Sequence, residues 1–151
     1  MKLTILSVGR DRSGLFAPAV TEYASRLSHV AKVQLIEIAE SKASGDRARS
    51  DEAQSIIAKL TSRDVLVALD ERGKQFSSVE FARWMSMQID HSRDIAFAIG
   101  GDEGLGEEVR KRSTLQLSLS AMTLPHRLAR VVLIEQIYRA FSIVRREPYH
   151  K

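Results

Sequence analysis

Short, unbroken runs of apolar residues recur along the chain and constrain its fold more than any other feature. The four clearest runs and one weaker run are Leu3–Val8, Val33–Ile38, Val65–Leu69, Ile95–Ile99 and, less strongly, Leu115–Leu119. The third and fourth runs are apolar at every position and do not alternate with polar residues. This pattern is typical of strands that are covered on both faces, as in parallel sheets.

The segments between these runs have the three- and four-residue spacing of amphipathic helices. The last segment is the clearest, because Pro125 suits a first helical turn and an apolar stripe runs from Leu128 to Phe141. Pro148 indicates that this helix has ended by then. Strands and helices therefore alternate, and we predict a single domain over residues 1–151. Its fold class is α/β, with three α/β/α layers and a mainly parallel sheet.

The excess of positive charge lies at the C-terminal end. The chain has a net charge of +4. Residues 125–151 contain six basic and two acidic side chains, which accounts for the whole excess. A phosphate-bearing partner near the C-terminus is one explanation. A helix with a solvated basic face explains the same pattern, and charge alone leaves both readings open.

Several classes of protein are excluded or disfavoured by what the sequence lacks. It has no cysteine, so disulfides, thiolate nucleophiles and cysteine-ligated metal sites are excluded. No apolar run approaches the roughly 20 residues that cross a bilayer, and the N-terminus lacks the apolar core of a secretory signal. No histidine pair or carboxylate cluster has the spacing of a metal site. We therefore expect a cytoplasmic protein without a membrane partner or a metal.

Two glycine clusters follow predicted strands. The first, Gly9–Gly14, resembles a phosphate loop only loosely, because it has neither the G-x-G-x-x-G spacing nor the lysine of a P-loop. The second contains Gly100, Gly101 and Gly104, directly after a strand of the buried type. Ligands of open α/β sheets bind beyond the carboxyl ends of strands, so this cluster is a candidate ligand loop. A simple strand-to-helix turn is the alternative.

The segment between the last strand and the last helix is a third candidate. Leu117–His126 combines small and apolar residues with three hydroxyl groups. It predicts either an apolar pocket with backbone hydrogen bonding or a strand followed by Thr123 as a helix N-cap. His126 follows at the predicted helix start, where a neutral imidazole would serve as a base or a hydrogen-bond partner. Further on, Glu135 and Arg139 have the spacing of a helix ion pair or of an interface pair.

These motifs occur together, in the same order, in one known family. The matching segments are 69–74, 98–105, 117–126, 130–140 and 148–150. They resemble the bacterial ribosomal large-subunit pseudouridine N3-methyltransferases of the SPOUT superfamily, over nearly the whole chain. The run SAMTLPH at 120–126 and the PYH tail at 148–150 are the most specific parts. Asp102 departs from the family pattern, in which proline is frequent at that position.

The resemblance implies a C-terminal trefoil (α/β) knot of the SPOUT type and a homodimer. It also implies S-adenosyl-L-methionine as the methyl donor and no metal. The family's cofactor-binding positions fall on Leu69, Gly100, Leu119, Ser120, Ala121, Met122, Thr123 and Leu124.

The resemblance further implies methylation of N3 of a pseudouridine in the helix 69 region of 23S ribosomal RNA, on assembled ribosomes and not on DNA. We expect His126 to be the base or the orienting group, and Tyr149 and His150 to stack on or hydrogen-bond the target base. The arginines expected to hold phosphates are Arg139, Arg145 and Arg146.

We expect the tail of each protomer to reach the site of its partner in a two-fold dimer. Two other functions remain open at this point. One is a methyltransferase of the same superfamily that acts on another RNA, such as tRNA. The other is a non-catalytic module that binds the ribosome.

Overall fold

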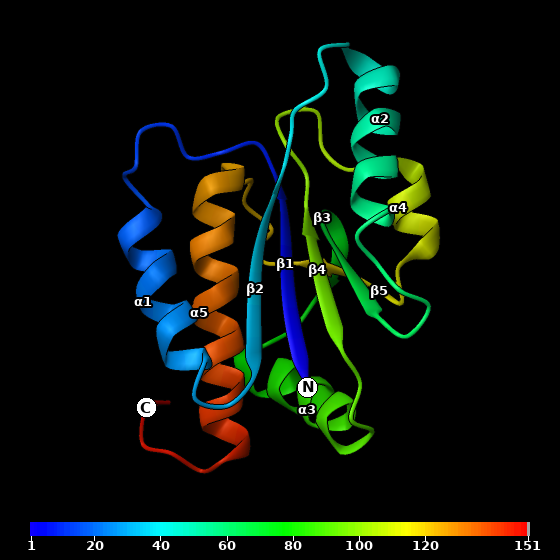
Figure 1. Cartoon of the computed structure of the whole chain (residues 1–151). Helices are drawn as coiled ribbons and strands as arrows, with labels where there is room; N and C mark the ends of the chain where they lie inside the picture. Colours follow the sequence, from blue (N-terminus) through cyan, green and yellow to red (C-terminus); the bar gives the residue numbers. More distant parts are fainter. Residues whose placement is uncertain (151) are drawn as a thin grey trace.

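The computed structural model describes residues 1–150 and contains one five-stranded sheet in which all neighbouring strands are parallel (Figure 1). The strands are β1 (Lys2–Val8), β2 (Lys32–Ile38), β3 (Val65–Gln75), β4 (Ile95–Ile99) and β5 (Leu115–Ser118). Their order across the sheet is β2-β1-β4-β3-β5. All five predicted strands are confirmed.

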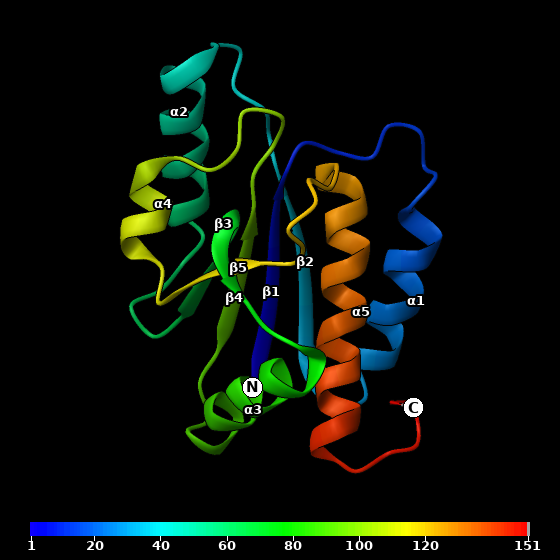
Figure 2. The same ribbon diagram turned by 180° about the vertical axis from the view of Figure 1, so that it is seen from behind.

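Five helices cover the two faces of this sheet. They are α1 (Ala17–Leu27), α2 (Gly45–Ile57), α3 (Ser78–Asp90), α4 (Glu107–Arg112) and α5 (His126–Val144). Figures 1 and 2 show α1 and α5 side by side on one face and α2 and α4 together on the other. The predicted three-layer α/β/α architecture is therefore confirmed. Within residues 1–150, no helix has the length and apolar character needed to span a membrane.

The side chains of each central strand alternate between two separate cores. Ile95, Phe97 and Ile99 of β4 pack in the core beneath α1, α3 and α5. Ala96 and Ala98 of the same strand pack in the core beneath α2 and α4. Because both faces of the strand are buried, every position is apolar, which is the pattern seen in the sequence.

The first residue of α5 decides one of the two interpretations of segment 117–126. The N-cap residue of α5 is Pro125, and no side chain caps this helix. The alternative reading of Thr123 as an N-cap is therefore wrong, and its hydroxyl is available for another contact.

Strand β3 is longer than predicted because it contains a large bulge. Leu69 and Lys74 both pair with Leu117 of β5, so residues 70–73 project from the sheet between them. A Cβ atom at Gly73 would lie 2.6 Å from the backbone oxygen of Gln116, so the strand returns to the sheet through a residue without a side chain. The bulge places polar residues 70–72 at the carboxyl edge of the sheet.

Candidate functional site

A large cavity lies beyond the carboxyl ends of β3, β4 and β5. Its volume is about 1230 Å³. Its walls include residues 70–72 of the β3 bulge, the β4–α4 connection and the β5–α5 connection. This is where open α/β sheets bind their ligands.

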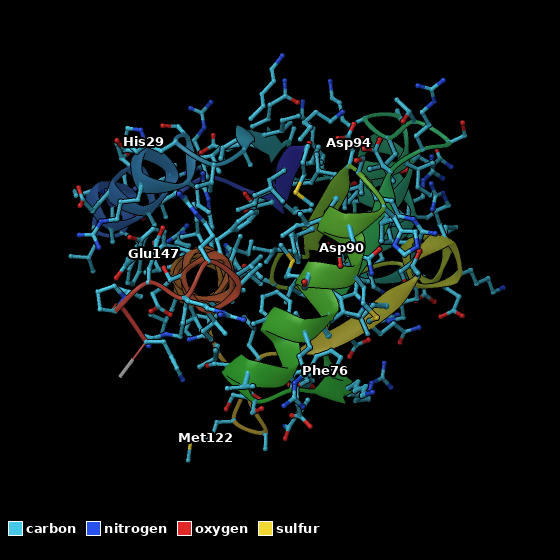
Figure 3. The ribbon with its side chains drawn as sticks, turned by 90° about the horizontal axis from the view of Figure 1, so that it is seen from below. His29, Phe76, Asp90, Asp94, Met122 and Glu147 are labelled. Carbon is cyan, nitrogen blue, oxygen red and sulfur yellow. The ribbon has the colours of Figure 1, made fainter. Side chains whose placement is uncertain are left out.

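Most of the residues predicted to bind the cofactor line this cavity. Those that line it are Leu69, Gly100, Leu119, Ser120, Met122, Thr123 and Leu124. Ala121 is not part of the lining, although its neighbours on both sides are. Met122 is 78% exposed and points away from the rest of the molecule, so it stands at the rim (Figure 3). The structure thus brings together seven of the eight positions.

The β4–α4 connection folds back tightly on itself. A Cβ atom at Gly100 would lie 2.6 Å from the carbonyl carbon of Gly104 and 2.8 Å from the backbone nitrogen of Leu105. Gly104 has a φ of +79°, which favours glycine. The glycine cluster is therefore needed for close backbone packing, and this packing shapes one wall of the cavity.

Hydrogen bonds fix the β5–α5 connection. Thr123 Oγ1 donates to Glu71 Oε2 at 3.0 Å, which ties this connection to the β3 bulge across the cavity wall. Ser118 Oγ donates to the carbonyl oxygen of Ser120 at 2.9 Å. The backbone N–H of Met122 donates to Ser120 Oγ at 2.9 Å. The hydroxyl groups of this segment therefore hold its backbone in place.

Asp70 anchors the base of the β3 bulge. Its carboxylate accepts hydrogen bonds from Arg110 Nε at 2.7 Å and from the backbone N–H of Arg72 at 2.9 Å. Burial favours a higher pKa for Asp70, but these hydrogen bonds and the two guanidinium charges outweigh it and lower the pKa. The cavity wall therefore carries a firmly ionised carboxylate.

The lining of the cavity is acidic although the chain is basic. The acidic lining residues are Asp46, Asp70, Glu71, Asp102, Glu103 and Glu107. The arginines are Arg49, Arg72, Arg110 and Arg127. An excess of carboxylates disfavours a polyphosphate and favours a ligand with net positive charge. S-adenosylmethionine fits, because it combines a sulfonium and an ammonium group with one carboxylate, and its adenine suits the leucine walls.

His126 also lines this cavity, at the first residue of α5. Its Nδ1 lies 3.3 Å from Asp102 Oδ1. A neutral imidazole beside this carboxylate keeps its proton on Nδ1, which leaves the lone pair on Nε2. Nε2 is buried and has no hydrogen-bond partner within residues 1–150. In this neutral tautomer, His126 has a buried proton acceptor, unpaired among the described residues, where the residue meets the cavity wall.

The other three predicted catalytic residues form a separate group, the tail cluster, at the far end of α5. It consists of Tyr23, Glu135, Arg139, Tyr149 and His150. Glu135 accepts hydrogen bonds from Arg139 Nε and from the hydroxyl of Tyr149, both at 3.0 Å. The hydroxyls of Tyr149 and Tyr23 lie 3.2 Å apart, and Arg139 Nη1 lies 3.4 Å from His150 Nδ1.

The pKa of Tyr149 is raised far above its usual value. Burial is the largest cause, followed by the hydrogen bonds with Tyr23 and Glu135 and by the negative charge of Glu135. Tyr149 is therefore a neutral hydrogen-bond donor and not a base at neutral pH. The spacing in the sequence predicts Glu135 as the partner of Arg139 in a helix ion pair or an interface pair, but not its place at the centre of this cluster. Its interruption of the apolar stripe of α5 is the signal that marks it.

Within one protomer the tail cluster does not meet the large cavity. Thirteen residues of α5 separate His126 from Arg139, which corresponds to about 20 Å along the helix. Figure 1 shows the C-terminal tail at the opposite end of α5 from the β5–α5 connection. In the view along α5, the tail that carries Glu147 leaves the end of the helix on the side of α1 (Figure 3). The predicted catalytic residues thus fall into two groups.

The chain is similar to known proteins over its described length. A family model described as "Predicted SPOUT methyltransferase" matches residues 1–150. Proteins named "Ribosomal RNA large subunit methyltransferase H" from Anaeromyxobacter sp. (strain Fw109-5) and Gemmatimonas aurantiaca are 50% and 42% identical, each over the full length of both chains. A solved structure of a probable methylase family protein from Haemophilus influenzae is similar in fold, with a TM-score of 0.57 at 15% identity. The similarity covers 99% of this chain and 70% of that one.

Proposed function

Because this chain belongs to the SPOUT methyltransferase family, we propose that it transfers a methyl group from S-adenosylmethionine to N3 of a pseudouridine in 23S ribosomal RNA. The target lies in the helix 69 region, and the assembled ribosome in the cytoplasm is the substrate. The observation that carries the proposal is the acidic cavity, which is lined by seven of the eight family cofactor positions. The name shared by the full-length relatives supports large-subunit ribosomal RNA as the acceptor.

The residues of the chain have distinct tasks in this reaction. When bound, the sulfonium supplies an electrophilic methyl group. The β4–α4 and β5–α5 connections would hold the donor for in-line attack by the acceptor nitrogen, and this alignment would be the main contribution to catalysis. His126 Nε2 takes the N3 proton, and the electron pair left on N3 forms the new bond to carbon. The bonding pair of the broken carbon–sulfur bond remains on sulfur.

The knot is also part of this proposal. Strand β5 lies at one edge of the sheet, whereas α5 packs against α1, which follows β1. The connection between β5 and α5 therefore leads from this edge across the molecule to the start of α5, as Figure 2 shows. This path and the family of the chain support a threaded C-terminal segment.

A two-fold dimer explains why the two groups of site residues are apart in one protomer. Leu128 and Val132 are one turn apart on α5, and neither belongs to or packs against either core. If these side chains face the same helix of the partner in antiparallel orientation, each tail cluster comes to the partner's large cavity. The active site then combines His126 of one protomer with Tyr149, His150 and Arg139 from the other.

Replacing Val132 with glutamate tests this interface. The carboxylate would be buried without a partner between the two α5 helices, so we expect Val132→Glu to be monomeric and to lose methyl transfer. Sedimentation velocity gives the mass, and circular dichroism checks the fold. The matched control is Val79→Glu, a change at an exposed residue of α3, which should leave the oligomeric state unchanged. A dimeric Val132→Glu variant would contradict an interface through α5.

Methyl-labelled cofactor tests the reaction itself. We expect label to enter the large subunit when the protein is incubated with ribosomes from a strain that lacks the modification. Nucleoside mass spectrometry should identify 3-methylpseudouridine. Naked ribosomal RNA should be a poor substrate, because a net charge of +4 gives only a modest electrostatic attraction to RNA. Label in tRNA would indicate the other RNA substrate. The absence of cofactor binding by calorimetry would indicate a non-catalytic ribosome-binding module.

A further inference from the structure

A second, smaller cavity lies beside the first, between the end of β1 and the first turns of α5. Its volume is about 130 Å³, enough for a single small ring. Figures 1 and 2 show the β1–α1 connection beside the start of α5, where this cavity lies. Val8, Phe16 and Leu35 contribute apolar walls. The two cavities share His126 and Arg127, so their contents are adjacent.

Four residues around the small cavity carry buried polar side-chain atoms that have no hydrogen-bond partner in the described part of the chain. Within residues 1–150, six buried side-chain atoms lack a hydrogen bond, and four of them belong to residues that line it. These four atoms are Ser7 Oγ, His126 Nε2, Arg127 Nε and Arg130 Nε. Ser7 is only 4% exposed. An unsatisfied buried polar group is costly, so four on the residues around one cavity point to a polar molecule, water or ligand, that completes them.

We propose that this cavity binds the imide edge of a uracil-type base, the target base of the proposed methyl transfer. That edge presents a carbonyl oxygen, an N3–H group and a second carbonyl oxygen. The arginine Nε atoms and the Ser7 hydroxyl are donors for the two carbonyl oxygens, and His126 Nε2 is an acceptor for N3–H. Cytosine presents an amino donor and an unprotonated N3 at the same positions, so its edge does not match. Proteins read unstacked RNA bases in this way.

The charges around the small cavity favour a neutral ring over a phosphate. Arg127 and Arg130 are balanced by Asp11 and Glu37, which also line the cavity. Glu37 Oε1 lies 3.7 Å from Arg130 Nη1, whereas Arg130 Nε has no partner. A phosphate would meet both carboxylates. A uracil-type ring would meet the donors without adding charge, and the donors would stabilise the negative charge that spreads to its oxygens when N3 loses its proton.

This proposal rests on the proposed function. Two measurements distinguish a failure of the small-cavity assignment from a failure of the proposed function. Calorimetry with S-adenosylmethionine tests the large cavity, and methyl transfer to ribosomes tests the reaction. Both are made first on the wild-type protein. Ser7→Ala and Arg130→Gln are then compared with Arg83→Gln, which changes an exposed arginine of α3. We expect each cavity variant to lower kcat/KM by about 10-fold or more, with cofactor affinity within about twofold of wild type.

Nuclear magnetic resonance gives a readout that does not depend on activity. In the protein saturated with S-adenosylhomocysteine, the Nε signals of Arg127 and Arg130 should shift on addition of pseudouridine or uridine. Cytidine should have no effect. Shifts with inorganic phosphate and not with the nucleosides would overturn the proposal in favour of an anion site. No shift with any probe, together with unchanged kcat/KM in both variants, would mean that the cavity holds only water.

Discussion

Replacing Gly100 with alanine is expected to weaken the binding of S-adenosylmethionine by about 100-fold or more and to leave the chain folded. The added Cβ would lie 2.6 Å from the carbonyl carbon of Gly104 and 2.8 Å from the nitrogen of Leu105. Both atoms belong to the backbone, so the β4–α4 connection must move as a whole. A displacement of about 1 Å in a binding loop costs on the order of 100-fold, and we expect at least this loss of affinity by calorimetry.

The neighbouring glycine provides the matched control. A Cβ atom at Gly101 would meet only the side chain of Val8, at 3.1 Å from Cγ1. A side chain adjusts more easily than a backbone segment, so Gly101→Ala should bind the cofactor within about fivefold of wild type. Thermal unfolding of both variants checks the fold. If Gly100→Ala binds as tightly as Gly101→Ala, the cofactor does not depend on this connection, and the assignment of the large cavity is wrong.

The strands could be predicted from the sequence because both of their faces are buried. In β4, the residues Ile95–Ile99 face two cores in turn, so the chain shows an apolar run that few other structures require. Helix α4 had no such signal. It has six residues and only one buried side chain, Val109, so no apolar period exists. Its acidic first turn and basic last turn match the helix dipole and were the only local indication of it.

The large cavity could be predicted from the sequence for a different reason. Glycines and hydroxyl residues follow neighbouring parallel strands, and the carboxyl ends of these strands meet at one edge of the sheet. The β3 bulge could not be predicted, because nothing in the sequence of Asp70–Gly73 distinguishes a projecting segment from an ordinary turn. The small cavity could not be predicted from the sequence either. Ser7 reads as a core position of β1, and its lack of a partner is a property of the packed molecule.

The separation of His126 from the tail cluster leads to the sharpest test of the dimer. We expect His126→Ala to lower turnover by about 100-fold or more, since it removes the proton acceptor. A variant that carries Tyr149→Phe and His150→Ala should also be inactive, because it removes the hydroxyl and the imidazole of the tail. Each variant should still bind S-adenosylmethionine, because neither change replaces a residue predicted to bind the cofactor.

Mixing the two inactive variants distinguishes a shared site from a site within one chain. If the tail acts on the partner's cavity, a mixed dimer has one site with both changes and one site with neither. Random exchange of subunits then restores about a quarter of the wild-type activity, because half of the dimers are mixed and each has one intact site. If the tail acts on its own chain, every site carries one of the changes and the mixture stays inactive. That result would reject the antiparallel pairing of α5 and require the tail to move about 20 Å within one protomer to reach His126.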